Sequence, residues 1–228
     1  MRIAPWSIGF LALALAACGQ QTAQTPTEPT PAAAPQPVAG PERRILAFGD
    51  SLFAGYGVGM ENSYPAQLEA ALRAEGINAR IFNAGVSGDT TAAGRQRLVF
   101  TLDGQKTAPD LVLLELGGND MLRALSPAET RANLEAMLDE LAKRDIPVLL
   151  MGMRAPPNYG PEYQGAFDAI YADLGKRPGV TLVPFWLETI YQRPELFQAD
   201  RLHPTVEGMG VLVSATKDAV KDALPPAP

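Results

Sequence analysis

Short apolar segments alternate with amphipathic segments along most of the chain. In the amphipathic segments apolar residues recur at helical spacing, and these segments lie at 64–75, 91–102, 126–144, 162–176 and 205–223. The apolar segments have the length of β-strands and lie at 44–48, 79–83, 111–116, 146–151 and 180–183. Strands that alternate with helices in this way predict an α/β fold, in which helices cover both faces of a parallel sheet.

The helix predicted at 126–144 has the clearest start. Ser126 is a candidate N-cap, Pro127 suits the first turn, and Glu129 stands where a capping box places its acidic residue. Apolar residues of this segment recur at helical spacing, so they are expected in the core rather than at a ligand. They are Leu134, Met137, Leu138 and Leu141.

The first 17 residues have the pattern of a signal peptide. Arg2 precedes an apolar segment at 8–15, which is too short for a membrane span, and small residues lead up to Cys18. Residues 15–18 resemble the lipobox of bacterial lipoproteins, which implies that Cys18 is lipidated and anchors the protein to a membrane. We therefore expect a lipid-anchored protein of the bacterial cell envelope that faces the periplasm, with a secreted soluble protein as the alternative.

The composition divides the chain into four parts. A signal peptide at 1–17 is followed by the cysteine and a Pro-, Ala- and Thr-rich linker at 18–41, one folded domain at 42–224, and a tail at 225–228. Cys18 is the only cysteine, so no intrachain disulfide can stabilise the domain. The formal net charge of −6, with both signs interspersed, argues against a nucleic-acid partner. We expect a monomer.

The chain contains one histidine, His203, which lies three residues after Asp200. Histidine often serves as a general base, because its unperturbed pKa is about 6.5. Ser51 follows the first predicted strand, where open α/β sheets place reactive groups. A serine, a histidine and a carboxylate brought together from distant positions would form a nucleophilic triad. Taken singly, a turn serine and a structural histidine are the alternative interpretation.

Two further segments follow the second and third predicted strands, at 83–91 and 116–120. Gly85 can offer a backbone N–H at close approach, and Asn119 can offer a side-chain amide. Acyl transfer develops negative charge on the carbonyl oxygen of the substrate, and donors of this kind stabilise it. These two residues are therefore candidates for an oxyanion hole.

Other interpretations of the site fit the sequence less well. The segment at 49–53 lacks the second glycine of the α/β-hydrolase elbow, and the match of Ser214 and Lys217 to S-x-x-K lies in a predicted helix. Asp50 and Asp120 are expected to stabilise turns. One histidine with scattered carboxylates is a poor match to a zinc site, so we expect no metal. The carboxylates that this metal site would use are Asp50, Asp120 and Asp200.

Four segments in order resemble the SGNH or GDSL hydrolase superfamily. They are Gly49-Asp50-Ser51-Leu52, Gly85, Gly117-Gly118-Asn119-Asp120 and Asp200-Arg201-Leu202-His203. The resemblance implies a three-layer αβα sandwich with a five-stranded parallel sheet in the order 2-1-3-4-5. It also implies that Ser51 is the nucleophile, that His203 and Asp200 complete the triad, and that no metal or organic cofactor takes part. The oxyanion hole would use the N–H groups of Ser51 and Gly85 and the side chain of Asn119.

Further segments at 86–91, 115–120 and 154–160 are similar to the bacterial arylesterase, thioesterase and lysophospholipase branch. This implies a serine carboxylester hydrolase that forms an acyl-enzyme from aryl esters, short to medium acyl esters, thioesters or lysophospholipids. An O-acetyl esterase acting on cell-envelope carbohydrate and a non-catalytic binding lipoprotein are the alternatives. Candidates for an apolar acyl surface, or equally for plain core packing, are Phe53, Tyr56, Met121, Leu122, Met153, Pro156 and Tyr159.

Overall fold

The computed structural model describes residues 38–226. Cys18, the predicted signal peptide and most of the predicted linker lie outside these residues. The described part contains one sheet of five parallel strands in the order β2-β1-β3-β4-β5. The strands are β1 (Arg43–Gly49), β2 (Ala79–Gly85), β3 (Leu111–Glu115), β4 (Val148–Met151) and β5 (Val180–Val183). The predicted α/β fold and strand order are confirmed.

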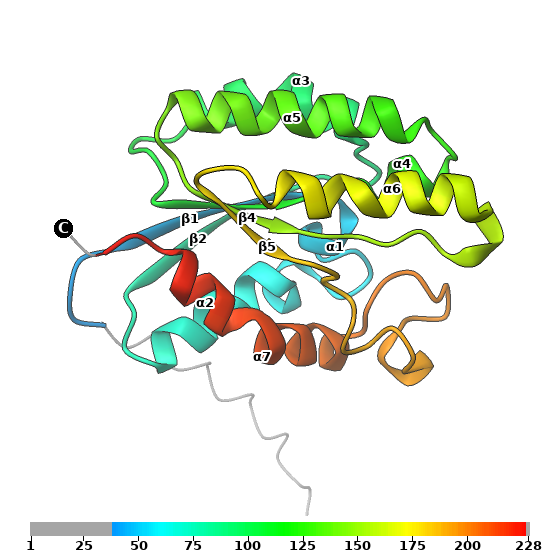
Figure 1. The fold of residues 1–228 in the computed structure, drawn as a ribbon. Helices are drawn as coiled ribbons and strands as arrows, with labels where there is room; N and C mark the ends of the chain where they lie inside the picture. The colour runs from blue at the N-terminus through cyan, green and yellow to red at the C-terminus, as the bar shows by residue number, and fades with distance from the viewer. Residues whose placement is uncertain (1–37, 227–228) are drawn as a thin grey trace, which may run out of the picture. The chain divides into compact units, whose positions relative to one another are not determined.

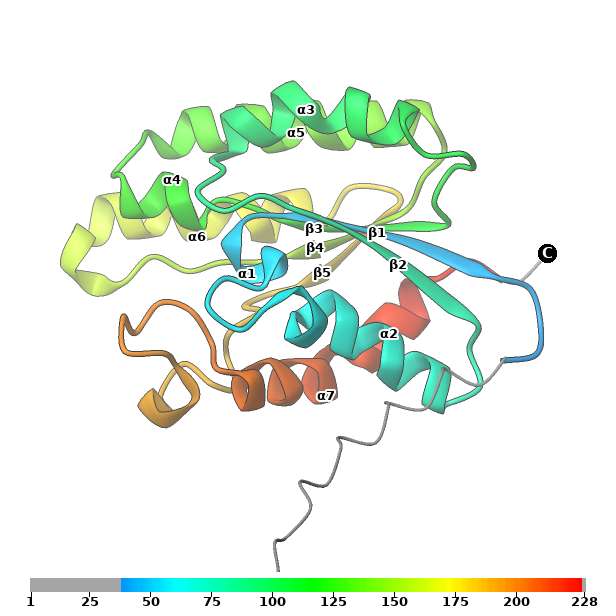
Figure 2. The same ribbon diagram turned by 180° about the vertical axis from the view of Figure 1, so that it is seen from behind.

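Helices cover both faces of this sheet (Figures 1 and 2). One face carries α2 (Tyr64–Ala74) and α7 (Val206–Ala223), and the other carries α3 (Thr91–Asp103), α5 (Pro127–Lys143) and α6 (Pro161–Leu174). The remaining helical elements are short. They are α1 (Ser51–Ala54), α4 (Gly118–Leu122), η1 (Met60–Asn62), η2 (Pro157–Tyr159) and η3 (Pro194–Leu196).

The chain reverses its direction of travel across the sheet at β1. The connection through α2 leads to β2 on one side of β1, and the connection through α3 returns to β3 on the other side. In open α/β sheets, ligands bind outside the carboxyl ends of the strands at such a point. Ser51 follows the carboxyl end of β1, so it lies at this position.

The core lies on both faces of the central strands. The side chains of β3 and β4 are buried throughout. This is expected for a parallel sheet that is covered on both sides, whose strands appear in the sequence as continuous apolar segments. The apolar residues predicted for the core side of α5 are all buried, which confirms that prediction. They are Leu134, Met137, Leu138 and Leu141.

Two of the local predictions that differ from the structure concern the start of α5 and the start of β4. Ser126 occupies the N-cap position of α5, but its side chain makes no capping hydrogen bond; its carbonyl instead accepts from the Thr130 N–H at 3.0 Å and the Thr130 hydroxyl at 3.2 Å. The strand predicted at 146–151 begins at Val148, because Pro147 has no N–H to donate to a neighbouring strand. Among residues 38–226, no helix has the length and apolarity that a membrane crossing requires.

Candidate active site

Ser51 is the first residue of α1, which begins directly after β1. The Asp50 side chain caps this helix by accepting a hydrogen bond from the Leu52 N–H at 3.0 Å, so its predicted role in the turn is confirmed. Gly49 allows the end of β1 to pack closely on β3, because a Cβ at this position would come within 2.8 Å of the Glu115 carbonyl oxygen. These contacts hold Ser51 just beyond the carboxyl end of β1, in a turn that packs against β3.

His203 and Asp200 reach Ser51 from the loop that precedes α7. The His203 Nε2 lies 2.9 Å from the Ser51 Oγ, and the His203 Nδ1 lies 2.7 Å from the Asp200 Oδ2. The other oxygen of Asp200 accepts hydrogen bonds from the N–H groups of Leu202 at 2.9 Å and His203 at 3.1 Å. The three predicted triad residues are therefore joined in one hydrogen-bonded series.

The charge of Asp200 fits this arrangement. Burial opposes the ionisation of Asp200, but hydrogen bonds from the Leu202 N–H and from the ring and N–H of His203 outweigh it and lower its pKa to about 2. Asp200 is therefore a carboxylate at neutral pH. A carboxylate at this position favours a proton on Nδ1 of the imidazole, which leaves Nε2 free to accept the Ser51 proton.

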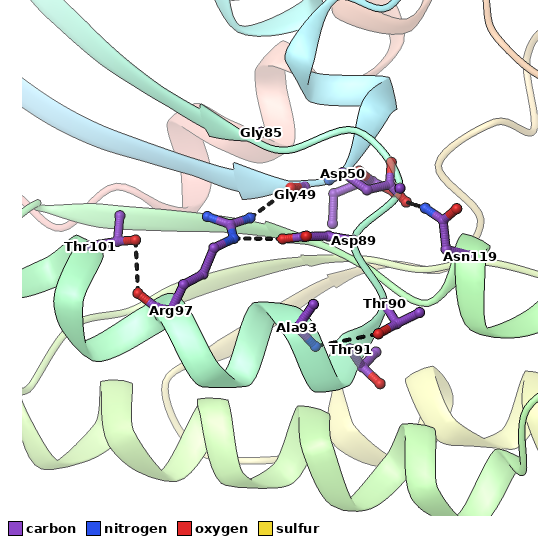
Figure 3. A network of polar contacts seen from close by, with 12 residues as sticks. Gly49, Asp50, Gly85, Asp89, Thr90, Thr91, Ala93, Arg97, Thr101 and Asn119 are labelled. Atoms are coloured by element: carbon purple, nitrogen blue, oxygen red, sulfur yellow. Dashed lines mark hydrogen bonds and ion pairs between the residues drawn. The ribbon is translucent and has the colours of Figure 1, made fainter.

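Asn119 faces the same site from α4. Its side-chain amide donates a hydrogen bond to the Asp50 Oδ2 at 2.8 Å (Figure 3). An amide carries two N–H groups, so this bond orients the side chain and leaves the second N–H available to a ligand. Asn119 lines the pocket beside Ser51, as the sequence predicted.

The position of Gly85 corrects the sequence prediction. Gly85 ends β2, and its N–H donates to the Asn83 Oδ1 at 2.9 Å, so this N–H is already used. A Cβ at Gly85 would come within 2.4 Å of the Ala54 nitrogen, which shows that this glycine allows α1 to pack closely on β2. Gly88 lines the pocket instead, in a turn where its φ is +84°. The third position of a β-turn often needs a glycine with positive φ. Gly88 stands at that position in its turn, so the turn pattern in the sequence could have pointed to Gly88, rather than Gly85, as the glycine beside the pocket.

A largely apolar pocket of about 340 Å³ surrounds Ser51, Asn119 and His203. Of the predicted acyl-surface residues, Tyr56, Met121, Leu122 and Met153 line it. Phe53 is buried in the core, where its ring stacks on that of Tyr64, and Pro156 and Tyr159 do not line the pocket. Leu187 and Leu202 also line the pocket and were missed. Leu187 lies in no recognisable motif, and Leu202 lies between two triad residues but carries no reactive group that would single it out.

Two buried carboxyl groups lie behind the nucleophile. The Asp50 N–H donates to the Glu115 Oε2 at 3.3 Å, and both side chains are almost inaccessible to solvent. Burial raises the pKa of Asp50, and burial together with the negative charge of Asp50 raises the pKa of Glu115 well above its usual range. Glu115 is thus the member of the pair that holds a proton most readily.

Other parts of the described chain do not join this site. Asp120 accepts hydrogen bonds from the Thr91 N–H at 2.8 Å and from the Thr91 hydroxyl at 2.5 Å, so it holds the start of α3. Within residues 38–226, no group of three or more His, Cys, Asp or Glu side chains is placed to hold a metal ion. A larger hollow of about 840 Å³ follows the β2 edge, and none of the predicted site residues lines it.

A hydrogen-bonded Ser-His-Asp series at the switch point of an αβα sandwich is the arrangement of a serine hydrolase. The family model described as the GDSL-like lipase/acylhydrolase family matches residues 47–211, and the chain belongs to this family.

Curated relatives and solved structures agree with this assignment. The chain is 42% identical to an arylesterase of Vibrio mimicus over 164 residues, which cover 72% of this chain and 81% of the relative. It is 39% identical to thioesterase 1/protease 1/lysophospholipase L1 of Escherichia coli over 160 residues, 70% of this chain and 74% of the relative. The crystal structure of AlinE4, an SGNH-hydrolase family esterase, is 61% identical, with a TM-score of 0.70 over 82% of this chain and all of the other. The protein is therefore a carboxylic ester hydrolase of the SGNH type.

Proposed function

We propose that Ser51 is the nucleophile of this esterase, that His203 is its general base and that Asp200 orients the imidazole. The observation that carries the proposal is the pair of contacts made by the one histidine, at 2.9 Å to the Ser51 Oγ and 2.7 Å to the Asp200 Oδ2. The chain has no second histidine that could take this role.

The reaction follows the two stages of acyl transfer. His203 Nε2 takes the proton of Ser51, and the Ser51 oxygen attacks the ester carbonyl carbon to form a tetrahedral oxyanion. The C–O bond to the alcohol then breaks, and His203 returns the proton to the departing alcohol oxygen. In the second stage, His203 removes a proton from water, which attacks the acyl-enzyme and releases the acid with Ser51 reprotonated.

The oxyanion hole is proposed to consist of the N–H groups of Ser51 and Gly88 and the side-chain amide of Asn119. All three residues line the pocket. Gly88 replaces Gly85, the glycine predicted from the sequence, because the Gly85 N–H already donates a hydrogen bond to the Asn83 Oδ1. Fixed donors of this kind lower the barrier because they bind the transition state more strongly than the ground state.

Substrates are proposed to be aryl esters, acyl thioesters or lysophospholipids with short to medium acyl chains. The names of the relatives support these leaving groups, since they include an arylesterase and a thioesterase 1/lysophospholipase L1. The pocket supports the acyl preference, because its volume of about 340 Å³ lies near the lower end of the roughly 300–1,000 Å³ typical of ligand sites.

A substrate panel tests this proposal. The wild-type protein is assayed with 4-nitrophenyl esters from acetyl to palmitoyl, with an acyl thioester and a lysophospholipid of matched chain length, and His203→Ala serves as the control. We expect kcat/KM to peak between butyrate and octanoate and the control to be inactive. A strict preference for acetate would favour carbohydrate deacetylation instead, and activity retained in His203→Ala would refute the proposed triad.

The location of the protein is also a proposal. Residues 15–18 support lipidation of Cys18, although they lie outside the described residues. We propose a monomeric esterase held on a bacterial membrane by this lipid and facing the periplasm.

A further inference from the structure

One arginine outside the proposed triad and oxyanion hole joins two parts of the candidate site. The Arg97 side chain rises from α3 to the carboxyl end of β1, where its Nη2 donates to the Gly49 carbonyl oxygen at 2.9 Å (Figure 3). Its Nε donates to the Asp89 Oδ2 at 2.6 Å. Gly49 lies two residues before Ser51, and Asp89 directly follows Gly88. A single guanidinium group therefore links the nucleophile turn to the turn that carries the proposed Gly88 donor.

The surroundings of Arg97 make this link rigid. Its side chain is 21% exposed and that of Asp89 is 12% exposed, so solvent screens their interaction only partly. The guanidinium carbon also lies 3.9 Å from the centre of the Phe48 ring. A planar guanidinium can donate in two fixed directions and stack on a ring at once, and the ammonium group of lysine cannot reproduce this geometry.

Both ends of the turn at 86–89 are tied to the same carbonyl oxygen. The Val86 N–H donates directly to the Gly49 oxygen at 3.0 Å, and Asp89 reaches that oxygen through Arg97. Within the turn, the Asp89 N–H donates to the Val86 carbonyl at 3.1 Å, and Gly88 has a φ of +84°. The direction of the Gly88 N–H therefore depends on how firmly this turn is held against β1.

We propose that Arg97 is a positioning residue that keeps the Gly88 N–H in register with Ser51 for stabilisation of the oxyanion. The inference rests on the proposed function, because it requires Gly88 to act in the oxyanion hole. A donor displaced from the oxyanion loses an interaction made only in the transition state, so the damage falls on kcat and leaves KM nearly unchanged. A merely structural arginine would alter thermal stability and leave kcat of the folded protein as it was.

The test compares variants of α3 at a temperature where each is folded. Arg97→Lys keeps the positive charge but loses the fixed geometry by which the guanidinium donates in two directions. We expect kcat for 4-nitrophenyl butyrate to fall about 10- to 100-fold. This loss is smaller than the loss of about 10²–10³ expected when an oxyanion donor is removed outright. An arylboronic acid, whose tetrahedral adduct on Ser51 places an anionic oxygen in the hole, should bind more weakly by a similar factor. Leu98→Ala, a buried position on the same helix, is the control that destabilises α3 and leaves kcat unchanged.

A second variant decides the matter if Arg97→Lys does not fold. Asp89→Asn removes the charge that holds Arg97 and keeps the shape of the side chain, and it should lower kcat in the same direction by a smaller factor. Wild-type kcat and boronic acid affinity in the folded variants would overturn the role of Arg97. Ser51→Ala distinguishes a failure of the proposed function from a failure of the positioning role. Full activity in Ser51→Ala would refute the proposed function. An inactive Ser51→Ala beside a fully active Arg97→Lys would refute only the positioning role of Arg97.

Discussion

Replacement of Asp200 by asparagine tests how the loop before α7 controls the histidine. The Asp200 Oδ1 accepts two backbone N–H groups, from Leu202 at 2.9 Å and from His203 at 3.1 Å, whereas Oδ2 faces the His203 Nδ1 at 2.7 Å. In Asp200→Asn the amide oxygen must stay where the two N–H groups point. The amide NH2 then faces Nδ1, which can only accept its hydrogen bond. The ring proton is forced onto Nε2, which faces Ser51 and can no longer accept the serine proton.

The expected loss follows from this tautomer. A correctly placed imidazole with the wrong tautomer costs about 10³–10⁴ in kcat, or about 4–5.5 kcal/mol at about 1.36 kcal/mol for each factor of ten. Asp200→Ala removes the carboxylate and imposes no tautomer, so the asparagine variant should be no more active than the alanine variant. Both are assayed with 4-nitrophenyl butyrate, with the melting temperature of each variant measured as a control for folding.

Two results would refute this reasoning. Activity of Asp200→Asn within tenfold of wild type would show that Asp200 does not set the tautomer of the histidine. Activity of Asp200→Asn well above that of Asp200→Ala would show that the amide is not oriented by the Leu202 and His203 N–H groups.

Three further predictions concern other groups of the chain. Asn119→Ala should lower kcat by about 10²–10³ with little change in melting temperature, and an unchanged kcat in steady-state assays would remove Asn119 from the oxyanion hole. Burial raises the pKa of Glu115, so the folded protein keeps the Glu115 proton at pH values where the unfolded chain, above about pH 4.5, releases it. The free energy of unfolding of the wild type should therefore fall as pH rises above that value. Glu115→Gln should lose less stability than wild type between pH 5 and 8 in urea titrations, and equal losses would contradict the buried proton. Cys18→Ser should carry no lipid mass when expressed with its N-terminal segment, and a lipid-bearing variant in the membrane fraction would overturn lipidation of Cys18.

The fold could be predicted well because its signals are local and repeated. The buried strands β1, β3 and β4 appear in the sequence as continuous apolar segments. Each is followed further along the chain by a long helix whose apolar residues recur at regular intervals. The short helices α1 and α4 were missed, because four or five residues are too few to show helical periodicity. The strand order came from the family resemblance, since apolar patterns do not reveal which strands are neighbours.

The site could be predicted where a residue's chemistry identifies it. The lone histidine, the turn serine and Asp200 stood out by type and order, and the structure brings them within hydrogen-bonding distance. The choice between Gly85 and Gly88 depended on which N–H is already bonded, and this is a tertiary property. Arg97 gave no signal, because one arginine in an amphipathic helix looks like any solvated charge.

The covalent fate of Ser51 tests the central claim most directly. A fluorophosphonate that matches a short acyl ester is incubated with the wild type, with Ser51→Ala and with Ser87→Ala, and the adducts are located by peptide mass spectrometry. Ser87 is the matched control, because it lines the same pocket and has no assigned role in the reaction. The proposed mechanism predicts one adduct, on Ser51, in the wild type and in Ser87→Ala, and none in Ser51→Ala. An adduct that persists in Ser51→Ala, or that lies on Ser87 in the wild type, would contradict it.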